Sequence, residues 1–101
     1  MNDSMKAVWN NQVLAESDET IVIEGNRYFP PSALRREFFE ESGYHTTCPW
    51  KGEASYYHVS VGSNKNENAA WYYPTPQATA IGKVGKDFSN YVAFWKGVIV
   101  S

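Results

Sequence analysis

The sequence predicts a mainly-β protein with one short α-helix, and three observations support this prediction. Residues 20–24 (TIVIE) and 54–61 (ASYYHVSV) alternate in the direction of their side chains, which is the period of a half-buried strand. Asn10-Asn11 separates two short apolar runs and tolerates the positive φ angles of a tight hairpin turn. Only residues 33–42 combine apolar side chains four positions apart with residues that cap helices. We therefore expect short antiparallel strands joined by tight turns.

The first thirty residues have the pattern of an antiparallel meander. Asn10-Asn11 provides its first turn and Gly25-Asn26 its second, since both pairs tolerate the backbone of a tight turn. Pro30-Pro31 ends the meander, because proline has no N–H to donate to a strand ladder. The strands of the meander are expected at residues 5–9, 12–15, 20–24 and 27–29.

A helix is expected over residues 33–42 (ALRREFFEES). Ser32 is a suitable N-cap and Gly43 a suitable C-cap. Leu34 and Phe38 lie four residues apart, which places both side chains on one helical face. The later elements are expected as strands at 46–48, 54–61 and 69–73, a polar loop at 62–68 (GSNKNEN), a short helical turn within 77–90, and a last strand or hairpin at 91–100 that bends at Lys96-Gly97.

Length and composition limit the class of protein. A chain of 101 residues is one domain, expected over residues 5–101 after a flexible segment 1–4, and Met5 is an alternative start. Nine basic and eleven acidic residues give a net charge of −2, which argues against nucleic acid as a partner. No apolar run has the length of a signal peptide or a membrane span, so no membrane partner is expected. The single cysteine, Cys48, suits a reducing compartment, and we expect a cytoplasmic protein.

The tripeptide Trp-Lys-Gly occurs twice, at residues 50–52 and 95–97. In each copy the glycine permits a tight corner between strands, so one interpretation is two hairpin corners whose indoles cover the core. The other interpretation is that two indole faces and two ammonium groups converge on one site. Aromatic faces bind flat rings by stacking and cations through their quadrupole, while lysine binds anionic groups.

Four stretches of the chain carry a family resemblance. They are RYFPPSAL (27–34), CPWKGEASYYHV (48–59), AAWYYPTP (69–76) and YVAFWKGV (91–98). In this order they resemble a bacterial, cyanobacterial and fungal family known as domain of unknown function 427, over nearly the whole chain beyond Met5. The resemblance implies a β-tent, in which two antiparallel sheets lean together at an angle. Methionine-R-sulfoxide reductases and the ligand-binding domain of cereblon share this architecture, and the family is sometimes labelled nucleotidyltransferase-like.

Metal and phosphate chemistry are not expected. Many β-tents hold zinc through paired cysteines, but His45 and Cys48 are only two ligands where a structural zinc site needs four. Nucleotidyl transfer needs paired carboxylates for a metal, whereas the chain has no Asp-x-Asp pair and only Glu53 as a carboxylate inside a shared motif. His58 stands where the family often has Asp, which weakens the case for a shared acid–base role. No metal site and no cofactor are expected.

The preferred interpretation is a small-ligand-binding module with an aromatic pocket between two sheets, for a small aromatic or cationic ligand. The first alternative is an enzyme, either thiol-dependent through Cys48 or acting on a nucleotide-like substrate through Lys51, Glu53 and Tyr56. The second is a protein-interaction module that presents exposed aromatic side chains. A monomer or weak homodimer is expected. The candidate ligand-binding residues are Trp50, Lys51, Tyr56, Trp71, Tyr73, Trp95 and Lys96, and the catalytic candidate is Cys48.

Overall fold

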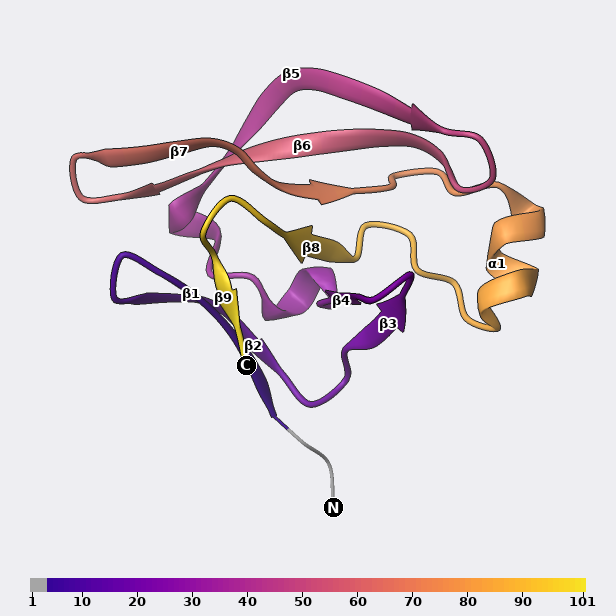
Figure 1. The fold of residues 1–101 in the computed structure, drawn as a ribbon, viewed down its shortest axis with the longest axis horizontal. Coiled ribbons are helices and arrows are strands. Elements are labelled where there is room, and N and C mark those ends of the chain that lie inside the picture. Colours follow the sequence, from indigo (N-terminus) through magenta and orange to yellow (C-terminus); the bar gives the residue numbers. More distant parts are fainter. Residues whose placement is uncertain (1–3) are drawn as a thin grey trace.

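Three antiparallel sheets and one short α-helix make up the computed structural model, which describes residues 4–101 (Figure 1). Residues 1–3, most of the expected flexible segment 1–4, lie outside the described residues. The strands are β1 (Met5–Trp9), β2 (Gln12–Ser17), β3 (Ile21–Ile23), β4 (Asn26–Tyr28), β5 (Phe39–Cys48), β6 (Gly52–Val61), β7 (Asn64–Tyr72), β8 (Val92–Phe94) and β9 (Ile99–Val100). The helix α1 spans Ala78–Val84, and two 3-10 turns, η1 and η2, span Pro31–Ala33 and Arg36–Phe38.

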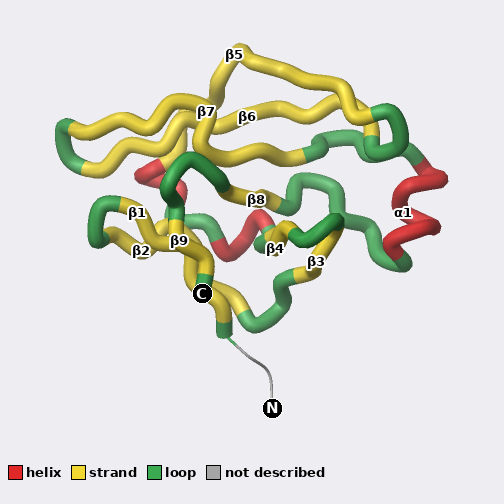
Figure 2. Tube along the Cα trace, viewed as in Figure 1, coloured by secondary structure: helices red, strands yellow, loops and turns green. Residues whose placement is uncertain are grey.

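The sheets differ in size, and the smallest is tied to the largest. The largest has the strand order β5-β6-β7-β8, the next β2-β1-β9, and the smallest is the β3-β4 hairpin. In Figures 1 and 2 the largest sheet lies above the two smaller ones, with α1 at the right. Phe29 exchanges two backbone hydrogen bonds with Val92 of β8, at 2.8 and 2.9 Å, and so holds the hairpin against the largest sheet. The mainly-β prediction is confirmed, with three sheets where two were expected.

The prediction of a helix over residues 33–42 is wrong. Leu34 forms an isolated β-bridge with Ala15, so this part of the chain is paired with β2. Strand β5 then begins at Phe39 and pairs with β6. Leu34, Phe38 and Phe39 all pack in one core from a backbone that is extended or in single 3-10 turns. Backbone pairing with neighbouring strands therefore overrides the local helix preference of this stretch.

Two expectations for the second half of the chain need correction, and one is confirmed. The polar stretch 62–68 is a tight turn at Gly62-Ser63 followed by the first residues of β7, rather than a loop. Residues 91–100 do not form a hairpin, because β8 pairs with β7 while β9 pairs with β1 in another sheet. The helical turn expected within 77–90 is α1, which ends at Gly85 with a φ of 86°.

The buried side chains form two clusters. The first joins β1 and β2 to the largest sheet, and the second joins the β3-β4 hairpin and α1 to the same sheet. Tyr72 belongs to the first cluster, whereas Trp71 and Tyr73 pack in the second, as alternation along a strand predicts. The largest fully buried side chains are Tyr28, Phe29, Phe88, Leu14, Val59 and Val92.

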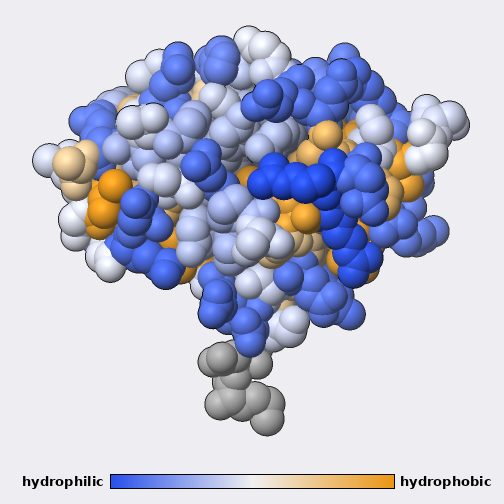
Figure 3. All heavy atoms as spheres, turned by 180° about the vertical axis from the view of Figure 1, so that it is seen from behind, coloured by the Kyte–Doolittle hydropathy of each residue, from blue (hydrophilic) through white to orange (hydrophobic). Residues whose placement is uncertain are grey.

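Apolar exposure is dispersed over the surface. On the face turned away from the viewer in Figure 1, apolar side chains form separate patches among hydrophilic ones (Figure 3). Among the described residues, the exposed large apolar side chains are Val22 of β3, Tyr44 of β5, Trp95 after β8, and Ile99 of β9.

Candidate functional site

The first Trp-Lys-Gly copy forms the corner between β5 and β6, and the loop before α1 covers it. The backbone carbonyl of Lys51 accepts a hydrogen bond from the Gln77 N–H at 3.0 Å. Gly52 has a φ of 117°, and a Cβ at that position would lie 3.4 Å from the Thr75 carbonyl oxygen. Glycine at this position therefore allows the corner and the loop to approach closely. As a result Lys51, whose charged side chain would normally be solvated, is only 4% exposed.

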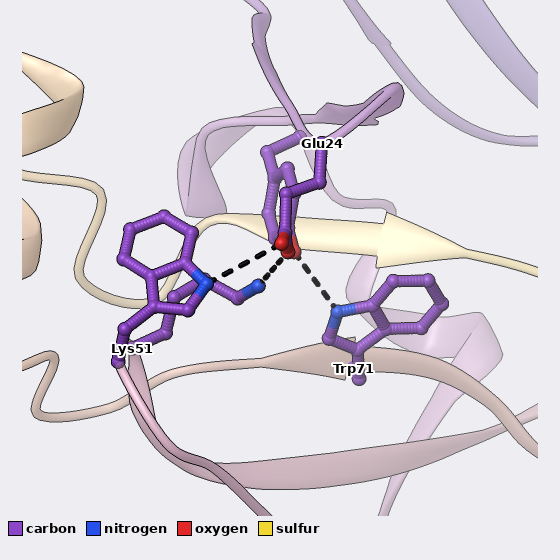
Figure 4. A network of polar contacts seen from close by, with 5 residues as sticks. Glu24, Lys51 and Trp71 are labelled. Carbon is purple, nitrogen blue, oxygen red and sulfur yellow. Dashed lines mark hydrogen bonds and ion pairs between the residues drawn. The ribbon is translucent and has the colours of Figure 1, made fainter.

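The ammonium group of Lys51 is held by Glu24, which lies in the turn between β3 and β4. Lys51 Nζ donates to the Glu24 carboxylate, and the Trp50 indole N–H donates to the same carboxylate at 3.3 Å (Figure 4). Lys51 Nζ also lies 4.7 Å from the ring centroid of Trp50 and 5.6 Å from that of Tyr73. Glu24 has a φ of 53°, an uncommon backbone for this residue type, so the turn holds it in a costly conformation beside Lys51.

Both members of this pair are charged at neutral pH. The hydrogen bond from Lys51 lowers the pKa of the Glu24 carboxyl below its ordinary value. Burial alone would lower the pKa of Lys51, but the hydrogen bond to Glu24 and the nearby Tyr28 and Cys48 groups raise it. The ion pair therefore places a paired ammonium and carboxylate, with no net charge, beside the aromatic rings.

The second Trp-Lys-Gly copy contributes its tryptophan to the same region, but not its lysine. The Trp95 ring meets the Trp71 ring edge to face, with centroids 5.9 Å apart. Lys96 has a φ of 55° in the turn that follows β8, and its ammonium donates to the Glu67 carbonyl at 3.0 Å on the exposed surface. Lys96 therefore does not line the cavity that Lys51 lines, although its Nζ lies 5.2 Å from the ring centroid of Trp95.

A bulge in β7 fixes the position of Trp95. The register between β6 and β7 shifts after Tyr57, and within the bulge Asn68 has a φ of 55°. The Asn68 N–H donates to His58 Nδ1 at 3.0 Å, and its side-chain oxygen accepts from the Ser42 hydroxyl at 2.5 Å. Its carbonyl accepts the Trp95 indole N–H, also at 2.5 Å. His58 is thus a structural acceptor, which accounts for a histidine at this position without any acid–base role.

These elements line an open cavity of about 270 Å³. Of the seven predicted binding residues, five line it, while Trp50 packs behind Lys51 and Lys96 lies outside. Sequence reasoning missed three of its lining residues, Glu24, Asn26 and Tyr28, and it placed Glu24 in a strand rather than in the turn where the structure has it. Tyr28 is coupled to the wall because the Trp71 indole N–H donates to its hydroxyl at 3.1 Å (Figure 4). The lining residues are Glu24, Asn26, Tyr28, Lys51, Tyr56, Trp71, Tyr73 and Trp95.

Comparison with known families supports the resemblance noted above. The model of the family described as a domain of unknown function, number 427, matches residues 1–100. The chain belongs to this family. No curated protein matches its sequence. Within residues 4–101, no helix is long and apolar enough to cross a membrane.

The residues considered for the two enzyme alternatives do not all lie together in the structure. His45 faces Ser55, with Nδ1 3.2 Å from the hydroxyl, and forms no hydrogen bond with Cys48 among the described residues. Glu53 is exposed and does not line the cavity. Burial raises the pKa of the partly buried Cys48 thiol, but backbone N–H groups of the following turn and the Lys51 charge lower it overall. Residues 4–101 contain no group of three or more His, Cys, Asp or Glu side chains placed to hold a metal ion.

Proposed function

We propose that the protein binds a small flat-ring ligand in the cavity between the largest sheet and the β3-β4 hairpin. The observation that carries this proposal is the meeting of five aromatic side chains around one cavity. Two of them lie in strands of the largest sheet, one lies in β4, and the other two directly follow β7 and β8. Aromatic side chains that surround a concave space bind rings by stacking and edge contacts. The aromatic lining residues are Tyr28, Tyr56, Trp71, Tyr73 and Trp95.

The charges around the cavity favour a neutral ring over a cation. Two of the five aromatic lining residues already have an ammonium near their rings, since Lys51 Nζ lies 5.6 Å from the ring centroid of Tyr73 and Lys96 Nζ lies 5.2 Å from that of Trp95. A second positive charge within about 4–6 Å would be repelled, and Glu24 is already paired with Lys51. The volume of about 270 Å³ is close to the lower limit of ordinary ligand sites, roughly 300 Å³, so the ligand has one or two rings.

Tryptophan fluorescence titration tests the proposal with three neutral ring probes, uracil, uridine and succinimide, and with choline as the cation. We expect saturable quenching by at least one neutral ring, none by choline, and loss of the response in Trp95→Ala. Trp9→Phe is the control, because Trp9 packs on the first cluster and does not line the cavity. A folded protein that shows no saturable response to any of the neutral rings would overturn the proposal. Saturable binding of choline would overturn the preference for neutral rings.

A second candidate, thiol chemistry at Cys48, is favoured only by the lowered pKa of its thiol. The Cys48→Ser variant distinguishes the two candidate functions. This variant should keep the binding of neutral rings, because Cys48 does not line the cavity. Loss of ring binding in a folded Cys48→Ser protein would favour the thiol instead.

A further inference from the structure

Three buried hydrogen-bond donors in the cavity are not used up by the protein. Tyr28, Lys51 and Tyr73 are 1%, 4% and 6% exposed, and all three line the cavity. The Tyr28 hydroxyl accepts from Trp71, so its own O–H remains available to donate. The Tyr73 hydroxyl makes no hydrogen bond to any described residue. Lys51 has three N–H groups and one hydrogen-bonded partner, Glu24, among the described side chains.

An acceptor lies beside these donors. The Glu24 carboxylate receives hydrogen bonds from Lys51 and Trp50, and it retains further lone pairs for a ligand. Its side chain is 55% exposed and lines the mouth of the same cavity. Among the described residues no fully buried side-chain nitrogen or oxygen atom lacks a hydrogen-bond partner, so the free Tyr73 hydroxyl is reached by solvent. An occupant that supplies an oxygen atom beside an N–H group would replace solvent at these groups and match this lining.

We propose that the ligand is a ring amide, in which the two lone pairs of a carbonyl oxygen accept from Tyr73 and Lys51 while the adjacent ring N–H donates to Glu24. The oxo edges of pyrimidine and purine bases have this arrangement. A ring carboxylate fits less well, because Glu24 would repel it and Lys51 is already neutralised. This inference rests on the proposed ring-binding function and specifies which rings are bound.

Four matched probes test the ligand side of the inference: 2-pyridone, N-methyl-2-pyridone, pyridine and benzoate. The readout is the shift of the indole N–H signals of the four tryptophans in an NMR titration. We expect 2-pyridone to bind tightest, since only it offers a carbonyl oxygen and a neighbouring N–H. N-methyl-2-pyridone loses only the hydrogen bond to Glu24 and should bind about threefold to tenfold more weakly, and pyridine, which has neither the carbonyl oxygen nor the N–H group, should bind more weakly still. Benzoate binding as tight as that of 2-pyridone would overturn the inference.

Tyr73→Phe tests the protein side, because it removes a hydroxyl that has no partner among the described residues. It should weaken 2-pyridone about threefold to tenfold and leave pyridine binding unchanged. Tyr91→Phe is the matched control, since Tyr91 is partly buried in the second cluster but does not line the cavity. Equal binding of 2-pyridone and pyridine, with no effect of Tyr73→Phe, would overturn the ring amide while ring binding stands. If no probe shifts any indole signal, ring binding itself fails.

Discussion

Substitution of Asn68 tests how the protein holds the Trp95 wall of the cavity. Asn68 adopts a φ of 55° and takes part in three hydrogen bonds, two of them through its backbone. Alanine keeps the backbone bonds but loses the bond from Ser42, which costs about 0.5–1.5 kcal/mol. Alanine also lacks the short polar side chain that lets asparagine tolerate the left-handed region, which costs roughly 1 kcal/mol more. Asn68→Ala should therefore lower the free energy of unfolding by about 1.5–2.5 kcal/mol.

Asn68→Gly separates the two contributions. Glycine also loses the bond from Ser42 but adopts positive φ without steric cost, so it should be about 1 kcal/mol more stable than the alanine variant. Urea unfolding with equal m-values measures the difference, which corresponds to roughly 4–8 °C in Tm for a domain of this size. The Trp95 indole N–H signal should stay in place in the glycine variant, because the Asn68 carbonyl is retained. Equal stability of the two variants would refute the role assigned to the backbone of Asn68.

Three further predictions concern the charged pair, the thiol and the corner glycine. Because the hydrogen bond from Lys51 lowers the pKa of Glu24, the stability from this pair is present above pH 4.5 and is lost as the pH falls below it. Glu24→Gln should therefore flatten the acid limb of the stability–pH curve, and an unchanged limb would contradict the pairing. Burial raises the pKa of Cys48 but the backbone N–H groups after it lower it overall, so the alkylation rate should reach its midpoint below pH 9.0, and a midpoint above that value would exclude an activated thiol. Gly52→Ala should lower the free energy of unfolding by about 1–3 kcal/mol in thermal unfolding. Gly43→Ala, at an open position without positive φ, should change that free energy by about 0.5 kcal/mol or less, and similar effects of the two variants would show that the corner is not tightly constrained.

Strand alternation explains why much of the cavity could be predicted from the sequence. Because successive side chains in a strand point to opposite faces, Trp71 and Tyr73 had to share one face, and the structure packs both in the second cluster. Tyr56 pairs with Trp71 across the β6–β7 ladder, which brings a third aromatic side chain to that face. These relations are local or one strand away, so a periodic pattern is enough to reveal them.

Contacts between residues far apart in the sequence could not be predicted from strand alternation. Leu34 and Phe38 have the spacing of a helical face, but that spacing does not show that Ala15 offers a backbone partner. Glu24 and Lys51 are 27 positions apart, and no local pattern joins a hairpin turn to a strand corner. The sequence placed Glu24 at the end of a strand and the turn at Gly25-Asn26, whereas the structure places the turn one residue earlier and gives Glu24 a φ of 53°.

The two Trp-Lys-Gly copies behave differently because the glycine has a positive φ in both, whereas the lysine has one only in the second. In the first copy only Gly52 has a positive φ, and Lys51 stays under the loop before α1, where its ammonium reaches Glu24. In the second copy Lys96 itself takes a φ of 55°, which turns its side chain out to the surface. Trp95 instead extends the β7–β8 ladder through its backbone N–H, which donates to Ala69 at 3.0 Å. One repeated tripeptide therefore supplies the cavity with a charge from one corner and a ring from the other.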